Sequence, residues 1–189
     1  NRIRLLDLKN MRTIDILKWG FKQKYMLAEL KVRDQSGYWP FPCLRSVAND
    51  GSWYESDLIH AVSLNRLNTK KDCTTIIVNS IKILEDWHNL TLMSTNTKVY
   101  CLSIETEILR LIEKSPLFDN KDKLMIIEWF DIIRKSFKDL WNYGKLPRTE
   151  LVEGHGDFQH GNIQVDLTDK IWIVDWEHSK KRQFAYDYF

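Results

Sequence analysis

One stretch near the carboxyl-terminal end constrains the fold of this chain more than any other. Residues 155–162 read His-Gly-Asp-Phe-Gln-His-Gly-Asn, and an apolar hairpin is expected over 163–174 directly after them. Asp175 comes at the end of the second strand of this hairpin. Because a hairpin returns the chain toward its starting point, the sequence predicts that Asp157, Asn162 and Asp175 lie close together.

These three side chains are of the kinds that phosphoryl transfer from a nucleotide requires. A carboxylate must orient the acceptor hydroxyl and accept its proton, and Asp157 can be that carboxylate. Mg²⁺ holds the triphosphate and prefers oxygen ligands, which Asn162 and Asp175 offer. The spacing His-x-Asp-x-x-x-x-Asn, followed by an apolar strand that ends in Asp, is typical of the catalytic set of protein kinases.

Together with Ile-Val-Asp-Trp-Glu at 173–177, the loop at 155–162 resembles the aminoglycoside phosphotransferase and choline kinase superfamily. These are small-molecule kinases built on the protein-kinase fold. The resemblance implies an α+β, bilobal, protein-kinase-like fold that is truncated at both ends. Residues 1–60 would be the remnant of the N-lobe, with a nucleotide-binding sheet, one helix and, at 53–59, a hinge strand that binds adenine. Residues 61–189 would be the largely helical core of the C-lobe, with the catalytic loop and the metal-binding hairpin.

The same resemblance implies roles for individual residues. Asp157 would be the catalytic residue, and Asn162 and Asp175 would bind Mg²⁺. Lys18, at the end of a predicted strand, would bind the phosphates of ATP. Glu29, the only acid of the predicted helix that follows, would pair with this lysine.

The implied activity is transfer of a phosphoryl group from ATP, with Mg²⁺, to the hydroxyl of a small molecule. The acceptor would be an aminoglycoside-like antibiotic, an amino alcohol such as choline or ethanolamine, or a related metabolite; the motifs lean slightly toward choline kinases. A catalytically silent pseudokinase that works as a binding module is the alternative, although all four core positions are filled. Gln23 is the alternative to Glu29 as the partner of the lysine, because the sequence leaves the helix register open.

Histidines in and after the loop suggest a second chemistry. His155, His160 and His178, with Asp157, could form a zinc cluster. Against this, no cysteine is near and the spacing His-x-x-x-His of a helical zinc site is absent. His155 is better explained as a structural residue that braces the loop through hydrogen bonds.

Residue patterns predict a small sheet first and helices afterwards. Alternation predicts strands, and apolar repeats at steps of three and four predict helices. The first 60 residues are expected to form strands at 2–8, 13–19, 44–47 and 53–59, with a helix at 21–33. Further helices are expected from a capping box at 69–72 to His88, at 103–114 and at 121–143. The last helix is expected to stop at Gly144, and its apolar stripe is expected to belong to the core; the stripe consists of Ile126, Phe130, Ile133, Phe137 and Leu140. Residues 151–162 are expected to be a loop. The basic run 180–182 is expected to be an exposed turn, unless Arg182 ties this segment to Asp187.

Charge and composition exclude two classes of partner. Lys and Arg total 28 and Asp and Glu 26 among 189 residues, so the net charge of +2 is too small to indicate nucleic-acid binding. No apolar run approaches the roughly 20 residues that cross a bilayer, so no membrane association is expected. Cys43, Cys73 and Cys101 are far apart and odd in number, which favours reduced thiols in a cytoplasmic protein.

Overall fold

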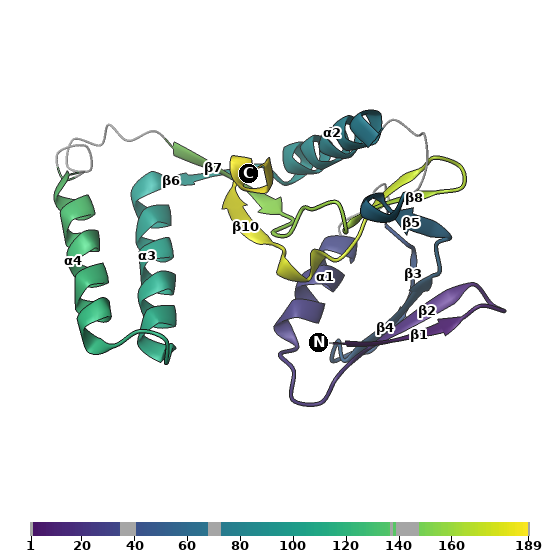
Figure 1. Ribbon diagram of the computed structural model, residues 1–189, viewed down its shortest axis with the longest axis horizontal. Coiled ribbons are helices and arrows are strands. Elements are labelled where there is room, and N and C mark those ends of the chain that lie inside the picture. Colours follow the sequence, from purple (N-terminus) through teal and green to yellow (C-terminus); the bar gives the residue numbers. More distant parts are fainter. Residues whose placement is uncertain (1, 35–40, 68–72, 137, 139–147, 189) are drawn as a thin grey trace. The chain divides into compact units, whose positions relative to one another are not determined.

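The chain forms two compact units (Figure 1). The computed structural model describes residues 2–34, 41–67, 73–136, 138 and 148–188. Unit 1 comprises Asn1–Leu92 and Val152–Phe189, and unit 2 comprises Met93–Leu151. The lobe boundary expected near residue 60 falls within unit 1, and the division into two lobes stays a prediction.

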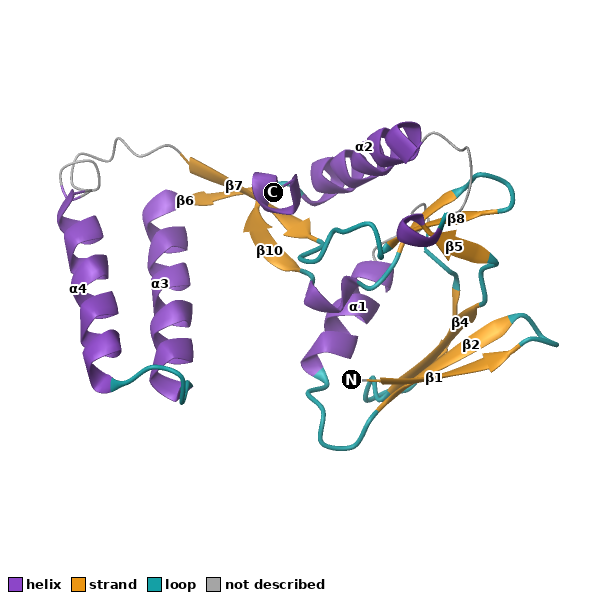
Figure 2. Ribbon diagram, viewed as in Figure 1, coloured by secondary structure: helices purple, strands orange, loops and turns teal. Residues whose placement is uncertain are grey.

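The amino-terminal sheet of unit 1 has the strand order β1–β2–β4–β3 (Figure 2). β1 (Arg2–Asp7) and β2 (Arg12–Leu17) form the predicted antiparallel hairpin. β4 (Trp53–Asp57) pairs antiparallel with β2, and β3 (Leu44–Val47) pairs antiparallel with β4. The four strands predicted in the first 60 residues are confirmed, although β2 and β4 each end two residues earlier than expected.

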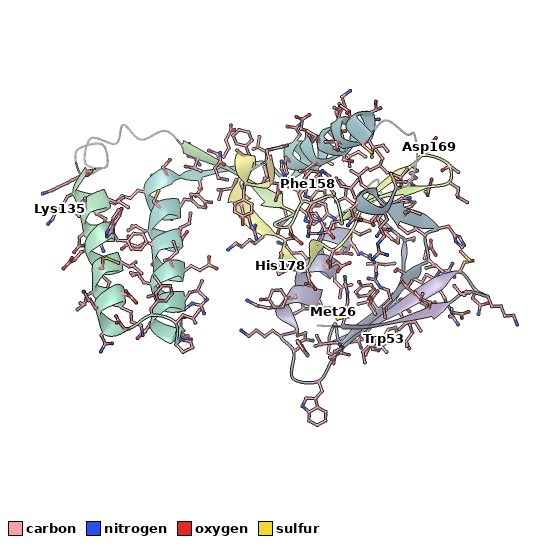
Figure 3. All side chains as sticks on the ribbon, viewed as in Figure 1. Met26, Trp53, Lys135, Phe158, Asp169 and His178 are labelled. Atoms are coloured by element: carbon pink, nitrogen blue, oxygen red, sulfur yellow. The ribbon has the colours of Figure 1, made fainter. Side chains whose placement is uncertain are left out.

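α1 (Lys24–Asp34) packs against this sheet through a small apolar cluster. Met26, labelled in Figure 3, and Leu30 are buried against Tyr54 of β4. Glu29 is also buried, at 1% exposure. A charged side chain is rarely buried to this extent unless it is paired, so the fold requires cationic partners for Glu29.

A second sheet of unit 1 has the strand order β5–β8–β9. β5 (Ala61–Ser63) leads into a 3₁₀ turn at Leu64–Arg66, and β8 (Ile163–Asp166) and β9 (Ile171–Ile173) form the predicted hairpin. α2 (Cys73–Thr91) contributes the helical side of its core. The buried apolar residues shared by these elements are Leu64, Ile76, Ile163, Val165 and Ile171. The hairpin is thus anchored by its own apolar side chains, as its sequence pattern indicates.

Two tryptophans form the centre of another core cluster in unit 1. Trp87 of α2 and Trp176, in the 3₁₀ turn Trp176–His178, have ring centroids 5.5 Å apart in an edge-to-face arrangement. Phe41 lies 5.4 Å from Trp176. The indole nitrogen of Trp87 also donates a hydrogen bond to the carbonyl of Glu153 at 2.6 Å. This cluster therefore joins α2 to the segments on both sides of the predicted catalytic loop.

The segment predicted to be a loop from residue 151 begins as a strand. β7 (Arg148–Gly154) is the middle strand of a sheet with the order β10–β7–β6. β10 (Lys180–Gln183) stands where an exposed turn was expected, and a 3₁₀ helix at Phe184–Tyr188 follows it. The lysines of β10 are exposed but Arg182 is buried. The turn prediction is wrong because backbone pairing, which the polarity of a basic run does not reveal, decides whether a segment is a strand.

Unit 2 contains β6 (Met93–Asn96), which pairs antiparallel with the first residues of β7, and two helices. α3 (Thr97–Lys114) and α4 (Asn120–Ser136) lie side by side (Figure 1). Asn96 caps α3 by accepting a hydrogen bond from the N–H of Val99 at 3.3 Å. Both predicted helices are confirmed over the residues that the structure describes, and the capping box at 69–72 and Gly144 lie outside them.

The apolar stripe of α4 was expected to be core, and this expectation is wrong for the described residues. None of the α4 residues is buried, and Ile133 of the stripe is 44% exposed. Amphipathic periodicity identifies an apolar face but does not identify what covers it.

No helix within the described parts of the chain is long and apolar enough to cross a membrane.

Removal of the Trp87 ring is expected to destabilise the protein strongly. Trp87→Ala should lower the free energy of unfolding by about 3–5 kcal/mol, because it leaves a cavity beside Phe41 and Trp176. Chemical denaturation followed by circular dichroism measures this change. Trp19→Ala is the control, since Trp19 is fully exposed, and should change stability by less than about 0.5 kcal/mol. Equal losses in the two variants would contradict the assigned core.

Candidate active site

The buried imidazole of His155 braces the loop between β7 and β8. Its Nδ1 accepts a hydrogen bond from the backbone N–H of Asp157 at 3.2 Å, so Nε2 carries the proton and donates to the carbonyl of Val174 at 3.0 Å. The ring of Trp176 packs against it, with centroids 4.5 Å apart. Burial lowers the pKa of His155, which keeps the imidazole neutral. The prediction that His155 is structural is confirmed.

Asp187 holds the same loop through the backbone. Its carboxylate accepts hydrogen bonds from the N–H groups of His155 at 2.6 Å and Gly156 at 2.8 Å. Nε2 of His88 lies 3.3 Å from the same carboxylate. Burial alone would raise the pKa of Asp187, but the His88 ring and the two N–H groups outweigh it and the pKa is lowered. Asp187 is therefore an ionised, buried anchor of the loop.

Gly156 is required at its position by space and by backbone conformation. Its φ of +85° is in the left-handed region that favours glycine. A Cβ there would lie 2.5 Å from the carbonyl oxygen of His178 and 2.6 Å from the guanidinium of Arg182. Arg182 donates to that same carbonyl at 2.7 Å. Arg182 was expected to bind Asp187. It binds the carbonyl oxygen of His178 instead, and its guanidinium occupies the space beside Gly156.

Asn162 is bound directly to the predicted catalytic carboxylate. Its Nδ2 donates to the backbone carbonyl of Asp157 at 2.8 Å and to Oδ2 of Asp157 at 3.1 Å. Gln159 donates to the same Oδ2 at 3.0 Å. The other carboxylate oxygen of Asp157 and the side-chain oxygen of Asn162 accept no hydrogen bond from a described residue. Both remain available to a substrate hydroxyl or a cation.

The hairpin returns Asp175 to Asn162, as its sequence predicts. The N–H of Val174 donates to the backbone carbonyl of Asn162 at 3.0 Å. Asp175 itself has φ 69° and ψ 53°, a left-handed conformation that Asp adopts more readily than most residues. Asn162 and Asp175 line one cavity of about 570 Å³ in unit 1. The two residues thus line the same cavity, and their role as metal ligands stays a prediction.

Arg2 of β1, which the sequence did not single out, connects Asp175 to the amino-terminal sheet. Its Nη2 donates to Oδ1 of Asp175 at 2.7 Å. Its Nη1 donates to Oε2 of Glu29 at 2.5 Å and to Oη of Tyr54 at 2.9 Å. Tyr54 in turn donates to Oε1 of Glu29 at 3.0 Å. Nε of Arg2 lies 3.4 Å from Asp15, which is also buried.

The charges of this network support each other. Burial alone would raise the pKa of Glu29, but Arg33 and Arg2 lower it. Burial alone would lower the pKa of Arg2, but Glu29, Tyr54 and Asp15 raise it. Glu29 is therefore a carboxylate and Arg2 a cation at neutral pH, and each compensates the desolvation of the other.

The structure places Lys18 away from this network, which corrects the expected pairing with Glu29. Lys18 follows the last residue of β2, is exposed, and forms no ion pair with any residue that the structure describes. Leu17, paired with Arg2 across the hairpin, packs against the α1 cluster. Because side chains alternate along the chain, the next residue points away from that face. The cations at Glu29 are Arg2 and Arg33.

Residues of the loop line two cavities of unit 1. The polar residues around the 570 Å³ cavity include Arg2, Arg4, Asp15, Glu29, Asn162 and Asp175. Asp157 lines a second hollow of about 540 Å³, together with Phe158, Gln183, Tyr186 and Asp187. Sequence alternation in β1 and β2 could have shown Arg2 and Asp15 on one face. Gln23, the alternative partner for the lysine, instead binds the backbone carbonyl of Asp50.

Replacement of Asp187 is expected to destabilise the protein in a pH-dependent way. Asp187→Asn leaves two buried N–H groups without their anion, so the free energy of unfolding should fall by about 1–3 kcal/mol at pH 7. The pKa of Asp187 is lowered in the folded protein, so its contribution is complete above the unfolded carboxyl pKa of about 3.9 and disappears as pH falls through the folded value. The difference between variant and wild type should therefore shrink below about pH 4.

Chemical denaturation at a series of pH values measures this difference. Asp86→Asn is the control, because Asp86 is an exposed carboxylate of α2. It should leave stability unchanged within about 0.5 kcal/mol at each pH. A loss at Asp187 that is the same at pH 7 and pH 3 would contradict the ionised anchor.

The fold of this chain is similar to that of solved kinase and phosphotransferase structures. Neither a protein-family model nor a curated protein sequence matches the chain. Solved structures do match it. A choline/ethanolamine kinase family protein from Mesorhizobium loti has 14% identity and a TM-score of 0.53, over 100% of this chain and 62% of that one. An ethanolamine kinase from Plasmodium vivax has 17% identity and a TM-score of 0.57, over 98% of this chain and 55% of that one.

A thermostable mutant of an aminoglycoside phosphotransferase is also similar, with 11% identity and a TM-score of 0.56, over 99% of this chain and 70% of that one. The chain thus spans 55–70% of the length of these three proteins. At such low identities the likeness is one of fold, and function depends on the site. The predicted fold is confirmed: the chain has an α+β, protein-kinase-like fold similar to that of these choline/ethanolamine kinase and aminoglycoside phosphotransferase structures.

Proposed function

We propose that this protein is an ATP- and Mg²⁺-dependent phosphotransferase that phosphorylates the hydroxyl of a small molecule. One observation carries the proposal: a single hydrogen-bonded loop and hairpin brings Asp157, Asn162 and Asp175 together. Asn162 bonds the Asp157 side chain, and the residue before Asp175 bonds the Asn162 backbone. The fold shared with choline/ethanolamine kinases and aminoglycoside phosphotransferases supports this assignment.

The donor set fits Mg²⁺. Asn162 and Asp175 face one cavity and offer a carbonyl and a carboxylate oxygen, the ligand types that this cation prefers. Magnesium commonly binds to one or two protein carboxylates and completes its shell with substrate phosphates and water. Bound there, the ion would neutralise charge on the phosphates of the nucleotide. The described residues contain no cluster of three or more His, Cys, Asp or Glu side chains that could hold a metal alone.

The cavity also offers a surface for the rest of the nucleotide. Leu58, Ile59 and Ala61, which follow β4, line it together with Pro42. The stretch ending at Ile59 is the one that the sequence motifs matched to an adenine-binding hinge strand. A cavity lined by both apolar side chains and charged groups suits a ligand with a flat base and anionic phosphates.

Asp157 lies where an acceptor hydroxyl would be oriented. Its Oδ2 is held by Asn162 and Gln159, which fixes the carboxylate plane and leaves Oδ1 free to accept the hydroxyl proton. The second hollow beside Asp157 would admit the acceptor. Amino alcohols such as choline or ethanolamine, and aminoglycosides, are the candidate acceptors, because the similar structures are kinases and phosphotransferases named for them.

Two carboxylate substitutions should have different effects. Asp157→Asn keeps the shape of the side chain but cannot take a proton, so turnover should fall by about 10²- to 10⁴-fold with little change in Mg²⁺-ATP affinity. Asp175→Asn removes a charged metal ligand and should weaken Mg²⁺-ATP binding as well as turnover. Steady-state assays with choline, ethanolamine and aminoglycosides, combined with calorimetric titration of Mg²⁺-ATP, measure both quantities.

Asp169→Asn is the matched control, because Asp169 is an exposed acid in the turn between β8 and β9 (Figure 3). It should leave turnover and affinity unchanged. Near-normal turnover of Asp157→Asn on an identified acceptor would refute the catalytic role of Asp157. Binding of Mg²⁺-ATP without turnover on any of these acceptors would favour a nucleotide-binding module over an enzyme.

A further inference from the structure

We infer that Arg2, and not Lys18, binds the phosphates of the nucleotide, and that Glu29 and Tyr54 are its positioning residues. This inference rests on the proposed function, because it assigns a residue of the same cavity. In this assignment the phosphate-binding residue is an arginine of β1 and not the lysine that follows β2.

The position of Arg2 is the first support. Its side chain is 17% exposed and lines the cavity that also holds Asn162 and Asp175. It extends from the face of the sheet on which Leu17 packs against α1. Lys18 is exposed after the end of β2 and is not among the described residues that line this cavity.

The support beneath Arg2 is the second observation. Nη1 is held by both Glu29 and Tyr54, and Glu29 is itself 1% exposed and held by Arg33 at 3.2 Å. A guanidinium fixed in this way has lost its rotamer freedom before a ligand binds, so less entropy is lost on binding. Among described residues Nη2 donates only to Asp175, which leaves its second N–H available.

The pairing of Arg2 with Asp175 is the third observation. Their 2.7 Å contact shows that the cation reaches the predicted metal ligand. A magnesium nucleotide carries a suitable partner for each group, a cation for Asp175 and phosphate oxygens for Arg2. Guanidinium groups bind phosphate oxygens with two parallel hydrogen bonds where geometry permits. Arg2 and the metal ligands would therefore bind adjacent parts of one ligand.

The test compares Arg2→Met with Lys18→Met in the complete protein, by calorimetric titration with MgADP and with adenosine. A lost charge-assisted hydrogen bond corresponds to a 10- to 100-fold weaker MgADP affinity for Arg2→Met, at about 1.5–3 kcal/mol per bond, while adenosine affinity should change less than about twofold. Lys18→Met should bind both ligands as the wild type does. The ratio of the two affinities separates phosphate binding from a general structural role.

Two further variants keep the inference testable if Arg2→Met folds poorly. Arg2→Met combined with Glu29→Gln removes the buried charge that the single substitution leaves with fewer partners, and should show the same selective loss for MgADP. Arg2→Lys keeps a charge but has one nitrogen, which cannot hold Glu29 and a phosphate in the same geometry. The MgADP affinity of Arg2→Lys should lie between that of the wild type and that of Arg2→Met.

The outcomes distinguish this inference from the proposed function. Unchanged MgADP affinity in Arg2→Met, equal losses for MgADP and adenosine, or a selective loss in Lys18→Met would each overturn the role of Arg2 while nucleotide binding by the wild type stands. A wild-type protein that binds neither ligand would overturn the proposed function itself, and this inference with it.

Discussion

The hydrogen bonds that fix the His155 loop are the interaction on which the rest of the site depends. Asp187 accepts hydrogen bonds from two backbone N–H groups at the start of the loop. The His155 ring accepts a hydrogen bond from the N–H of Asp157 and donates one to the carbonyl of Val174. These hydrogen bonds of the buried residues His155 and Asp187 hold together segments that are distant in sequence. Leaving buried polar groups without hydrogen bonds costs free energy, so few other conformations of the loop are allowed. The carboxylate of Asp157 therefore has a defined position.

A second constraint is the burial of Glu29 on α1. A carboxylate that is 1% exposed is tolerated because Arg2, Arg33 and Tyr54 surround it. This requirement couples the helix to β1 and β4, and through Arg2 it reaches Asp175. The amino-terminal sheet and the segment that follows the β8–β9 hairpin are thus joined by charge pairs, whereas the hairpin and α2 are joined by apolar packing.

Local patterns predicted elements whose stability is local. The hairpin of β8 and β9 and the helices α1 to α4 follow from alternation and from periodic apolar residues. β7 and β10 were missed because each depends on pairing with a segment far away in the chain. The prediction that the stripe of α4 belongs to the core was wrong, since none of the α4 residues is buried. Periodicity shows that one face of a helix is apolar, but it does not show whether another element covers that face.

The sequence by itself determined which groups could do the chemistry. The order and spacing of Asp157, Asn162 and Asp175 were visible because one short loop and one hairpin carry all three. Only the tertiary structure decided which cationic side chain lies beside Asp175. Strand register turns Lys18 outward and Arg2 inward, and a shift of one residue reverses every side chain of a strand. Side chains that meet across elements depend on register and packing, which composition and spacing do not encode.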